Sequence, residues 1–314
     1  MQITKLISRE ELSHLTRTSN LRATGLVLVN FALIAAGFAL PIVWHTWEAW
    51  LGATVLLGAR ALGLGILVHD TAHGTLFSSR KINQWAGKWL FGGLPNVPFE
   101  AYRNGHLAHH RNAGTEADAD LAFVDRYPAS GASLARKFAR DLSGLNGIKN
   151  LYFQIRTFRL KDQVPFIVSH ALLLALLCVM HHAEVYLCWW LGQIFVFPIV
   201  MRLRVMGEHG GVPDHFDRDP RKNTGTTLAG PLARLLCAPN YVNYHVEHHF
   251  AAAVPSYRLR ALHLLLKSKG CYEGWTCVQP SYFAVIKRCW SGHSTAGLPP
   301  DSKRVAKGAL NNMQ

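Results

Sequence analysis

The sequence predicts an all-α integral membrane protein, with four transmembrane helices arranged as two hairpins and a helical cap on the cytoplasmic side. Two observations carry this prediction. Hydrophobic residues make up 49% of the 314 residues and charged residues only 17%, which is below the roughly 25% of soluble domains. The second is a set of apolar runs that reach or approach the roughly 20 residues needed to cross a hydrocarbon core. These runs are residues 25–44, 50–68, 164–180 and 185–201.

Short connectors join these runs in pairs. His45–Ala49 links the first two and His181–Glu184 the last two, and neither connector contains Lys or Arg. Each pair therefore predicts a helical hairpin. The chain carries 33 Lys and Arg against 19 Asp and Glu, and all of the basic residues except Arg60 lie outside the hairpins. The positive-inside rule then places the N-terminus, the central loop and the C-terminus in the cytoplasm. The basic excess reflects topology and predicts no nucleic-acid partner.

The rest of the chain, residues 69–163 and 202–290, is predicted to form the cytoplasmic cap of a single domain spanning 1–314. Ile82–Pro95 is apolar but short and interrupted by Lys88, so we expect it to lie in the membrane interface. Arg60 falls within a predicted span, where an ionised side chain is costly and functional by default. Two roles are open for it: binding a substrate carboxylate, or hydrogen bonding between helices.

Eight of the 17 histidines fall in three short windows. The windows are His69-Asp-Thr-Ala-His73, His106-Leu-Ala-His109-His110 and His245-Val-Glu-His248-His249. Residues i, i+3 and i+4 share one helix face, so each window can direct all its imidazoles at one point. All three windows lie on the cytoplasmic side of the predicted spans, so we expect them to meet over the helix ends. The histidines without an expected catalytic role are His14, His45, His170, His181, His182, His215, His263 and His293; of these, His170 lies in a span and is expected to hydrogen-bond within the bundle.

Eight neutral imidazoles exceed what one metal ion binds and suit two ions. Imidazole is a ligand for Zn, Cu, Fe and Ni, and the absence of Cys from the windows argues against a structural zinc site. The neighbouring hydrocarbon phase offers unactivated C–H bonds, whose cleavage requires metal–oxygen chemistry. We therefore predict a pair of redox-active irons held by the cap.

The motifs HDTAH, HLAHH and NYHVEHH, in this order around two hairpins, resemble the three histidine boxes of the membrane fatty acid desaturase/hydroxylase family. The resemblance covers residues from about 25 to about 265, and the residues around box three are in the style of bacterial members. It implies a multi-pass protein of a bacterial cell membrane with a non-haem di-iron centre. The implied ligands are His69, His73, His106, His109, His110, His245, His248 and His249.

The resemblance also implies a ninth ligand on a helix between the second hairpin and box three. His209, in MGEHGG, is the match. Some relatives carry an Asn one turn earlier that reaches the metal through water; Val205 stands there, so that contact is not carried over. The fused cytochrome domain of some relatives, with its HPGG motif, has no counterpart. Electrons are therefore expected from a separate ferredoxin- or cytochrome-type protein.

Carboxylates near the boxes are candidates for orienting the ligands, because metal-bound imidazoles usually donate their second N–H to a carboxylate or carbonyl. We predict this role for Asp70 and Glu247, and Asp118 and Asp120 are further candidates. No motif indicates the residues that bind substrate.

The implied reaction is an O2-dependent desaturation of the acyl chain of a membrane lipid or other acyl compound, with two ferrous ions as cofactors. A hydroxylase, ketolase or epoxidase acting on a lipid, carotenoid or other apolar substrate is the alternative, since the HDxxHG form of box one also occurs in carotenoid ketolases. The surroundings of box three look more like those of acyl desaturases. From another class, a metal-binding membrane protein or transporter would place its ligands within the spans, where only His170 lies.

Overall fold

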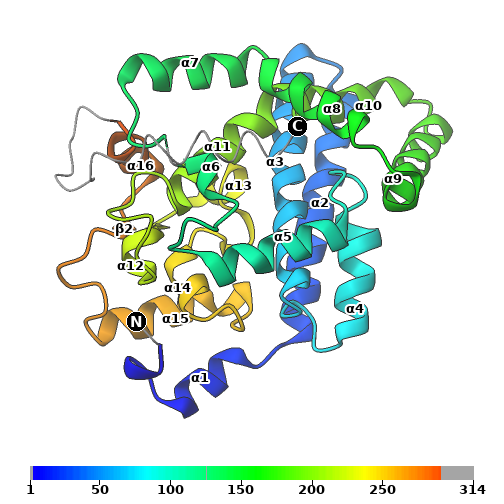
Figure 1. The fold of residues 1–314 in the computed structure, drawn as a ribbon. Helices are drawn as coiled ribbons and strands as arrows, with labels where there is room; N and C mark the ends of the chain where they lie inside the picture. Colours follow the sequence, from blue (N-terminus) through cyan, green and yellow to red (C-terminus); the bar gives the residue numbers. More distant parts are fainter. Residues whose placement is uncertain (1–2, 125, 291–314) are drawn as a thin grey trace.

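The computed structural model describes residues 3–124 and 126–290, and this part of the chain is mostly helical (Figure 1). Four helical segments are long and apolar enough to cross a membrane, as the hydropathy predicts. They are α2 (Asn20–Trp44), α3 (Trp47–Ala72), α9 (Leu160–Val179) and a composite segment over Ala183–Glu208. The composite segment consists of η3 (Ala183–Val185), α10 (Tyr186–Leu191), the π-helical turn η4 (Gly192–Val196) and α11 (Phe197–Glu208). His293 lies outside the described residues.

Shorter elements make up the rest of the described chain. Before and between the long helices lie η1 (Ile3–Lys5), α1 (Arg9–Thr16), α4 (Arg80–Trp85), the π-helical η2 (Ala86–Phe91), α5 (Phe99–Asn112), α6 (Leu121–Val124), α7 (Gly131–Leu142) and α8 (Leu145–Arg156). After them come α12 (Pro220–Asn223), β1 (Thr226–Thr227), α13 (Pro231–Leu236), η5 (Pro239–Tyr241), α14 (His245–Phe250), α15 (Ser256–Ser268), β2 (Val278–Gln279) and α16 (Tyr282–Arg288). The two short strands pair in parallel.

A two-residue connection joins α2 to α3. His45 ends α2 in the left-handed conformation, with φ 49°. Thr46 then caps α3 through its hydroxyl, which accepts a hydrogen bond from the Ala49 N–H at 3.3 Å. A side-chain oxygen at this position satisfies one of the N–H groups that a helix start leaves free. The two helices therefore pack against one another along their length (Figure 1).

The helices extend beyond the predicted spans where polar residues turn inward. α3 ends at Ala72 rather than 68, and the composite segment ends at Glu208 rather than 201. His69, Asp70 and Glu208 lie in these extensions and are buried. Hydropathy falls at such residues although the helix continues, so a hydropathy window ends too early. His69 consequently lies within α3 and not beyond it.

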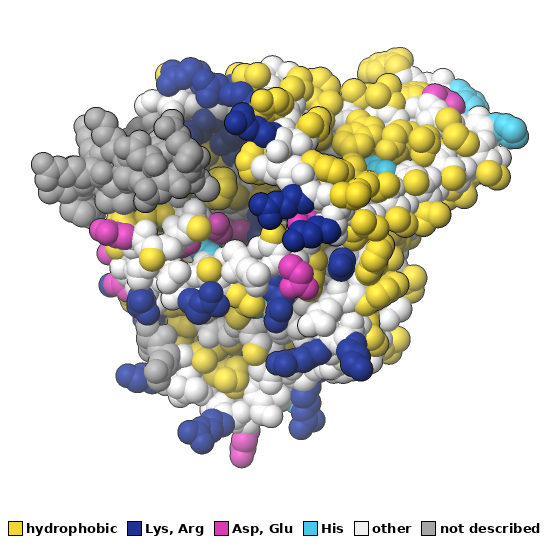
Figure 2. Space-filling model, turned by 45° about the vertical axis from the view of Figure 1, so that its right-hand side comes forward, with side chains coloured by type: hydrophobic (Ala, Val, Ile, Leu, Met, Phe, Trp, Pro, Cys, Tyr) yellow, Lys and Arg dark blue, Asp and Glu magenta, His cyan; other side chains and the backbone are white. Residues whose placement is uncertain are grey.

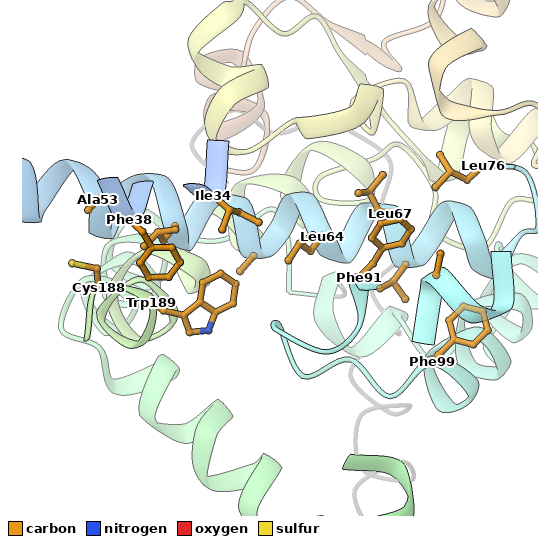
Figure 3. Close-up of a cluster of buried hydrophobic side chains, with 14 of the residues drawn as sticks. Ile34, Phe38, Ala53, Leu64, Leu67, Leu76, Phe91, Phe99, Cys188 and Trp189 are labelled. Atoms are coloured by element: carbon orange, nitrogen blue, oxygen red, sulfur yellow. The ribbon is translucent and has the colours of Figure 1, made fainter. Parts of the chain in front are cut away.

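The main apolar core joins α2, α3 and α10 to the segment that leads to α5 (Figure 3). Phe38 of α2 and Trp189 of α10 pack against α3, and Phe91 and Phe99 extend the same cluster toward the histidine boxes. The α3 and composite helices approach very closely: a Cβ on Gly58 would lie 2.7 Å from the Gly192 carbonyl oxygen. Glycine at this crossing allows the backbones to touch.

Two polar residues inside the spans have interhelical partners. Arg60 is 2% exposed; its Nη1 donates to Asn30 Oδ1 at 3.3 Å and its Nη2 to the Leu235 carbonyl. Of its two predicted roles, these contacts support the one in helix packing. The His170 ring contacts the Tyr186 hydroxyl at 2.7 Å and the Leu94 carbonyl at 3.0 Å, so its predicted place as a hydrogen-bonded bundle residue is confirmed.

On the face shown in Figure 2, hydrophobic side chains cover a broad region at the upper right, whereas Lys and Arg are most frequent on the left and lower parts. Within the segment expected at the interface, Trp85 and Trp89 are exposed while Phe91 is buried. Such a split between an apolar outer face and a buried inner face is compatible with a membrane-surface location.

Candidate metal centre

Three helices and one helix end bring the histidine boxes together. α3 carries His69 and is followed directly by its C-terminal cap His73, α5 carries box two and α14 carries box three. His209 stands where α11 ends. The windows are far apart in sequence, yet the rings of His69 and His248 have their centroids 4.5 Å apart.

The imidazoles form two groups whose nitrogens converge. The five-histidine group consists of His69, His73, His106, His110 and His248. The four-histidine group consists of His109, His209, His245 and His249. Within each group the candidate ligand atoms lie within 4.8 Å of one another. The groups adjoin, because the His110 and His249 rings stack at 4.4 Å between centroids.

Boxes two and three each serve both groups, which differs from the expectation that one box converges on one point. His106 and His110 belong to one group and His109 to the other. Successive residues of a helix are rotated by about 100°, so residues i and i+4 point about 40° apart, whereas i+3 and i+4 point about 100° apart. The i, i+4 pair therefore stays together, and the i+3 histidine turns to the neighbouring group. His248 separates from its own box in the same way.

In the five-histidine group the Nε2 atoms form a continuous series of close contacts. The distances are 2.8 Å between His73 and His106, 3.2 Å between His106 and His110, 2.9 Å between His110 and His248, and 3.0 Å between His248 and His69. In the four-histidine group the Nε2 distances are 2.9 Å for His209 and His245, 3.1 Å for His245 and His249, and 3.3 Å for His249 and His109.

These distances fit a metal ion at the middle of each group. An imidazole nitrogen lies about 2.0–2.1 Å from a bound divalent metal such as zinc, so adjacent ligands of an octahedral ion stand about 3.0 Å apart. The chemistry agrees. His209 Nδ1 faces the Asn223 carbonyl at 3.0 Å, which can only accept, so its Nε2 presents a lone pair to the group. Converging lone pairs are favourable only when a cation lies between them.

Several acceptors hold the outer nitrogens of the rings. His69 Nδ1 lies 2.9 Å from Asp70 Oδ1, and His109 Nδ1 lies 2.8 Å from Asp118 Oδ1. Asp120 is farther from His109, at 3.6 Å. Such partners fix the tautomer and direct Nε2 toward the metal. Asp70 and Asp118 thus have the contacts expected of ligand-orienting carboxylates.

Glu247 differs from its expected position. Its carboxylate accepts from Thr226 Oγ1 and His263 Nδ1, each at 2.5 Å, and from the Tyr272 hydroxyl, and among the described contacts none is to a box imidazole. On α14 its side chain is rotated by about 200° from His245 and so points to the opposite face. Glu247 therefore anchors the back of the box-three helix instead of orienting a ligand.

The environment keeps most of the box histidines uncharged. Burial, followed by the neighbouring imidazoles, lowers the pKa of His73 to about 4, of His110 to about 2 and of His209 to about 3. The same causes hold the pKa of His106, His245, His248 and His249 well below the usual value. Burial lowers the pKa of His109 too, but the hydrogen bond to Asp118 and the negative charges of Asp118, Asp120 and Glu208 together outweigh burial, so this pKa is raised. Neutral imidazole is the form that binds a metal.

Other residues around the centre were not identified from the sequence. Arg204 and Glu208 form an ion pair at 2.7 Å, and Glu208 Oε1 lies 3.7 Å from His245 Nδ1. Tyr102 stacks on His106 with ring centroids 5.6 Å apart. The i, i+4 spacing of Arg204 and Glu208 is typical of an ion pair on one helix face. Both residues lie beyond the predicted end of the fourth span, so the sequence did not place them on a helix.

A family comparison covers the part of the chain that carries the histidine groups. The family model described as "Fatty acid desaturase" matches residues 45–281, which include all nine histidines of the two groups. The chain belongs to the fatty acid desaturase family. Family membership, the histidine groups and the four apolar helices together identify a membrane oxidoreductase with a site compatible with iron.

Relatives within the desaturase family differ in the reaction that their names state. A "Beta-carotene ketolase" from Paracoccus sp. is 29% identical over 75% of this chain and 93% of its own length. An "sn-1 oleoyl-lipid 12-desaturase" from Synechocystis sp. is 26% identical over 81% of this chain and 77% of its own length. An "sn-1 acyl-lipid omega-3 desaturase (ferredoxin)", also from Synechocystis sp., is 29% identical over 36% of this chain and 30% of its own length.

Proposed function

We propose that this protein is an O2-dependent di-iron desaturase that introduces a double bond into an acyl chain. The observation that carries the proposal is the convergence of nine imidazoles into a group of five and a group of four. Contacts near 3 Å between Nε2 atoms correspond to the spacing of ligands around a metal ion. Two such groups side by side suit two ions, and all-nitrogen ligation suits iron.

In this proposal the five-histidine group holds one iron and the four-histidine group the other. The iron pair supplies the reduction of O2 and the oxidation of a C–H bond. The protein supplies the positions of the ligands: Asp70 and Asp118 hold the rings of His69 and His109, and the Asn223 carbonyl holds the ring of His209. Burial of the box histidines limits the access of water, which protects the reaction from side products.

The proposed topology has two transmembrane hairpins, α2–α3 and α9 with the composite segment, and a cap facing the cytoplasm of a bacterial cell. Both termini then lie in the cytoplasm, because the basic residues gather on the segments outside the hairpins. Electrons would come from a separate ferredoxin- or cytochrome-type protein. The ferredoxin in the name of one relative supports this part of the proposal.

A ketolase or hydroxylase acting on an apolar substrate is the second candidate. The match to a "Beta-carotene ketolase" over 93% of that protein's length favours it. Both reactions begin with the removal of a hydrogen from a methylene group. The difference lies in whether a second hydrogen is lost or oxygen is inserted, which depends on how the substrate is placed.

Expression in a bacterial host, followed by mass spectrometry of its lipids, tests the proposal. A product lighter by two hydrogens supports desaturation, and a product that gains oxygen supports the second candidate. His106→Ala and His248→Ala should each abolish turnover while the protein still accumulates in the membrane. His14→Ala, at an exposed histidine outside both groups, is the control and should retain activity. Activity in either box variant, or metal uptake into vesicles without an oxidised product, would overturn the proposal.

A further inference from the structure

A buried arginine of α3 contacts the chain segment that precedes box three. Arg60 is 2% exposed and belongs to a candidate membrane span. None of the ion pairs in the described part of the chain includes it. A guanidinium buried without a carboxylate partner is costly, so the hydrogen bonds that it makes point to a specific role.

The Arg60 guanidinium connects α3 to α2 and to α13. Its Nη1 donates to Asn30 Oδ1 of α2 at 3.3 Å, and its Nη2 donates to the Leu235 carbonyl. α13 ends one residue after Leu235, and the last carbonyls of a helix have no partner within it. Arg60 therefore supplies a donor that α13 lacks, and the two helices lie side by side (Figure 1).

A second contact lies five residues farther along the chain. Asn240 Nδ2 donates to the Gly63 carbonyl of α3 at 2.9 Å, and Asn240 Oδ1 accepts from Asn30 Nδ2 at 2.8 Å. Asn30 thus takes part in both contacts. Gly63 leaves room for it, since a Cβ there would lie 2.4 Å from Asn30 Oδ1. On either side of Asn240, Cys237 and Val242 pack in one apolar cluster with α3.

These contacts lie close to box three in sequence and close to box one along α3. Asn240 lies five residues before His245, where α14 begins. Gly63 lies six residues before His69, which corresponds to about 9 Å along the helix. The ring centroids of His69 and His248 are 4.5 Å apart. The same helix therefore carries box one and holds the segment that leads into box three.

We propose that Arg60 is a positioning residue for the metal centre. Together with Asn30 it clamps residues 235–240 to α3 and so sets the position of box three relative to box one. This inference rests on the metal-binding part of the proposed function and applies equally to a desaturase and a ketolase. A role in helix packing alone predicts a different result, because an apolar side chain in place of a buried charge is often neutral or stabilising.

Hydrogen–deuterium exchange and iron titration of the purified, full-length protein in nanodiscs test the clamp. We expect Arg60→Met to raise the exchange of residues 235–250 by roughly 10-fold or more, because hydrogen bonds from a charged group are lost. Exchange in α9 should stay unchanged. Iron affinity should fall by roughly 10-fold, as for other changes outside the ligand set, even where the melting temperature does not fall.

Two further variants separate positioning from packing. Arg60→Lys keeps the charge but loses the planar fork that reaches two acceptors, so it should restore iron affinity in part. Thr54→Val is the control, since Thr54 is a buried residue of α3 whose hydroxyl partners Cys188 of α10. It should leave iron affinity and the exchange of residues 235–250 unchanged.

Unchanged iron affinity in Arg60→Met, or exchange that rises equally in α9, would overturn the inference. If Arg60→Met does not accumulate, Asn240→Gly tests the same clamp. Asn240 has φ 55°, which glycine adopts without strain, and the variant should raise exchange in the same residues. The two proposals fail differently. Unchanged exchange of residues 235–250 in Arg60→Met contradicts the clamp alone, whereas an unaltered protein that binds iron and yields no oxidised product contradicts the proposed function alone.

Discussion

The two histidine groups are neighbours, but they differ in ligand number and surroundings. The five-histidine group includes His69 and His73 of α3, so it is built directly onto a helix of the apolar core. The four-histidine group draws on α5, α14 and the end of α11, and it borders the small cavity lined by Asp118, Asp120 and Asn223. The first group thus has more ligands and a more rigid support.

This difference in ligand number and support suggests that the two histidine groups have different roles. An iron ion that takes up to six ligands has more positions left in the four-histidine group, and a small cavity borders His109 and His209 of that group. We infer that the five-histidine group mainly retains its metal and that the four-histidine group meets the substrate. Weakening each group in turn tests this comparison.

Removing a ligand from the smaller group should have the largest effect. His245→Ala leaves three imidazoles there, so we expect the iron content to fall by about half and turnover to fall by more than the roughly 100-fold typical of outer-shell changes. Iron analysis of the purified protein and product formation in the host measure both effects. Unchanged iron content would show that His245 is not a ligand.

Removing one ligand from the five-histidine group should cause a smaller loss of iron. His73→Ala leaves four imidazoles, the number that the smaller group has naturally. We expect most of the iron to be retained although turnover is lost, as in His106→Ala. Equal loss of iron in the two variants would contradict the comparison.

The sequence predicted the metal centre more completely than it predicted the arrangement within it. Spacing alone identified the box histidines, because i, i+3, i+4 patterns are visible in one dimension. The separation of His109 from His106 and His110 depends on where the rings of the other four-histidine group members lie, and box two alone does not specify their position. Hydropathy found the four spans, but it missed the C-terminal ends of the second and fourth because Asp70 and Glu208 are buried polar residues. The partners of Glu247 come from chain segments that meet only in the folded protein.

Weakening a ligand-orienting carboxylate should also reduce metal binding more in the four-histidine group than in the five-histidine group, but by less than the loss of a ligand. Asp118→Asn and Asp70→Asn keep the size of the side chain and weaken the acceptor for His109 and His69 respectively. We expect a loss of roughly 10- to 100-fold in metal affinity for Asp118→Asn and less for Asp70→Asn, because the larger group has more remaining ligands. Metal titration measures the affinity. Glu116→Gln, at an exposed residue in the same loop, is the control, and a larger effect of Asp70→Asn would reverse the comparison.

The smallest effect on the metal is expected behind box three, where both groups share α14. Glu247→Gln weakens the contacts to Thr226, His263 and Tyr272. We expect unfolding to become easier by about 2–3 kcal/mol with little change in iron content, because hydrogen bonds to a charged group are worth about that much. Thermal unfolding in detergent measures this effect, and Glu273→Gln, at an exposed glutamate nearby, should leave the melting temperature unchanged. A lower iron content with an unchanged melting temperature would assign Glu247 to the metal site instead.

The central claim is that the nine imidazoles hold a pair of irons, and the most direct test is metal analysis with Mössbauer spectroscopy on purified, iron-57-loaded protein. We predict about two irons per chain in two distinguishable environments, one for each group, and about one iron per chain in His245→Ala. One zinc per chain, or a single iron environment at one ion per chain, would contradict the account.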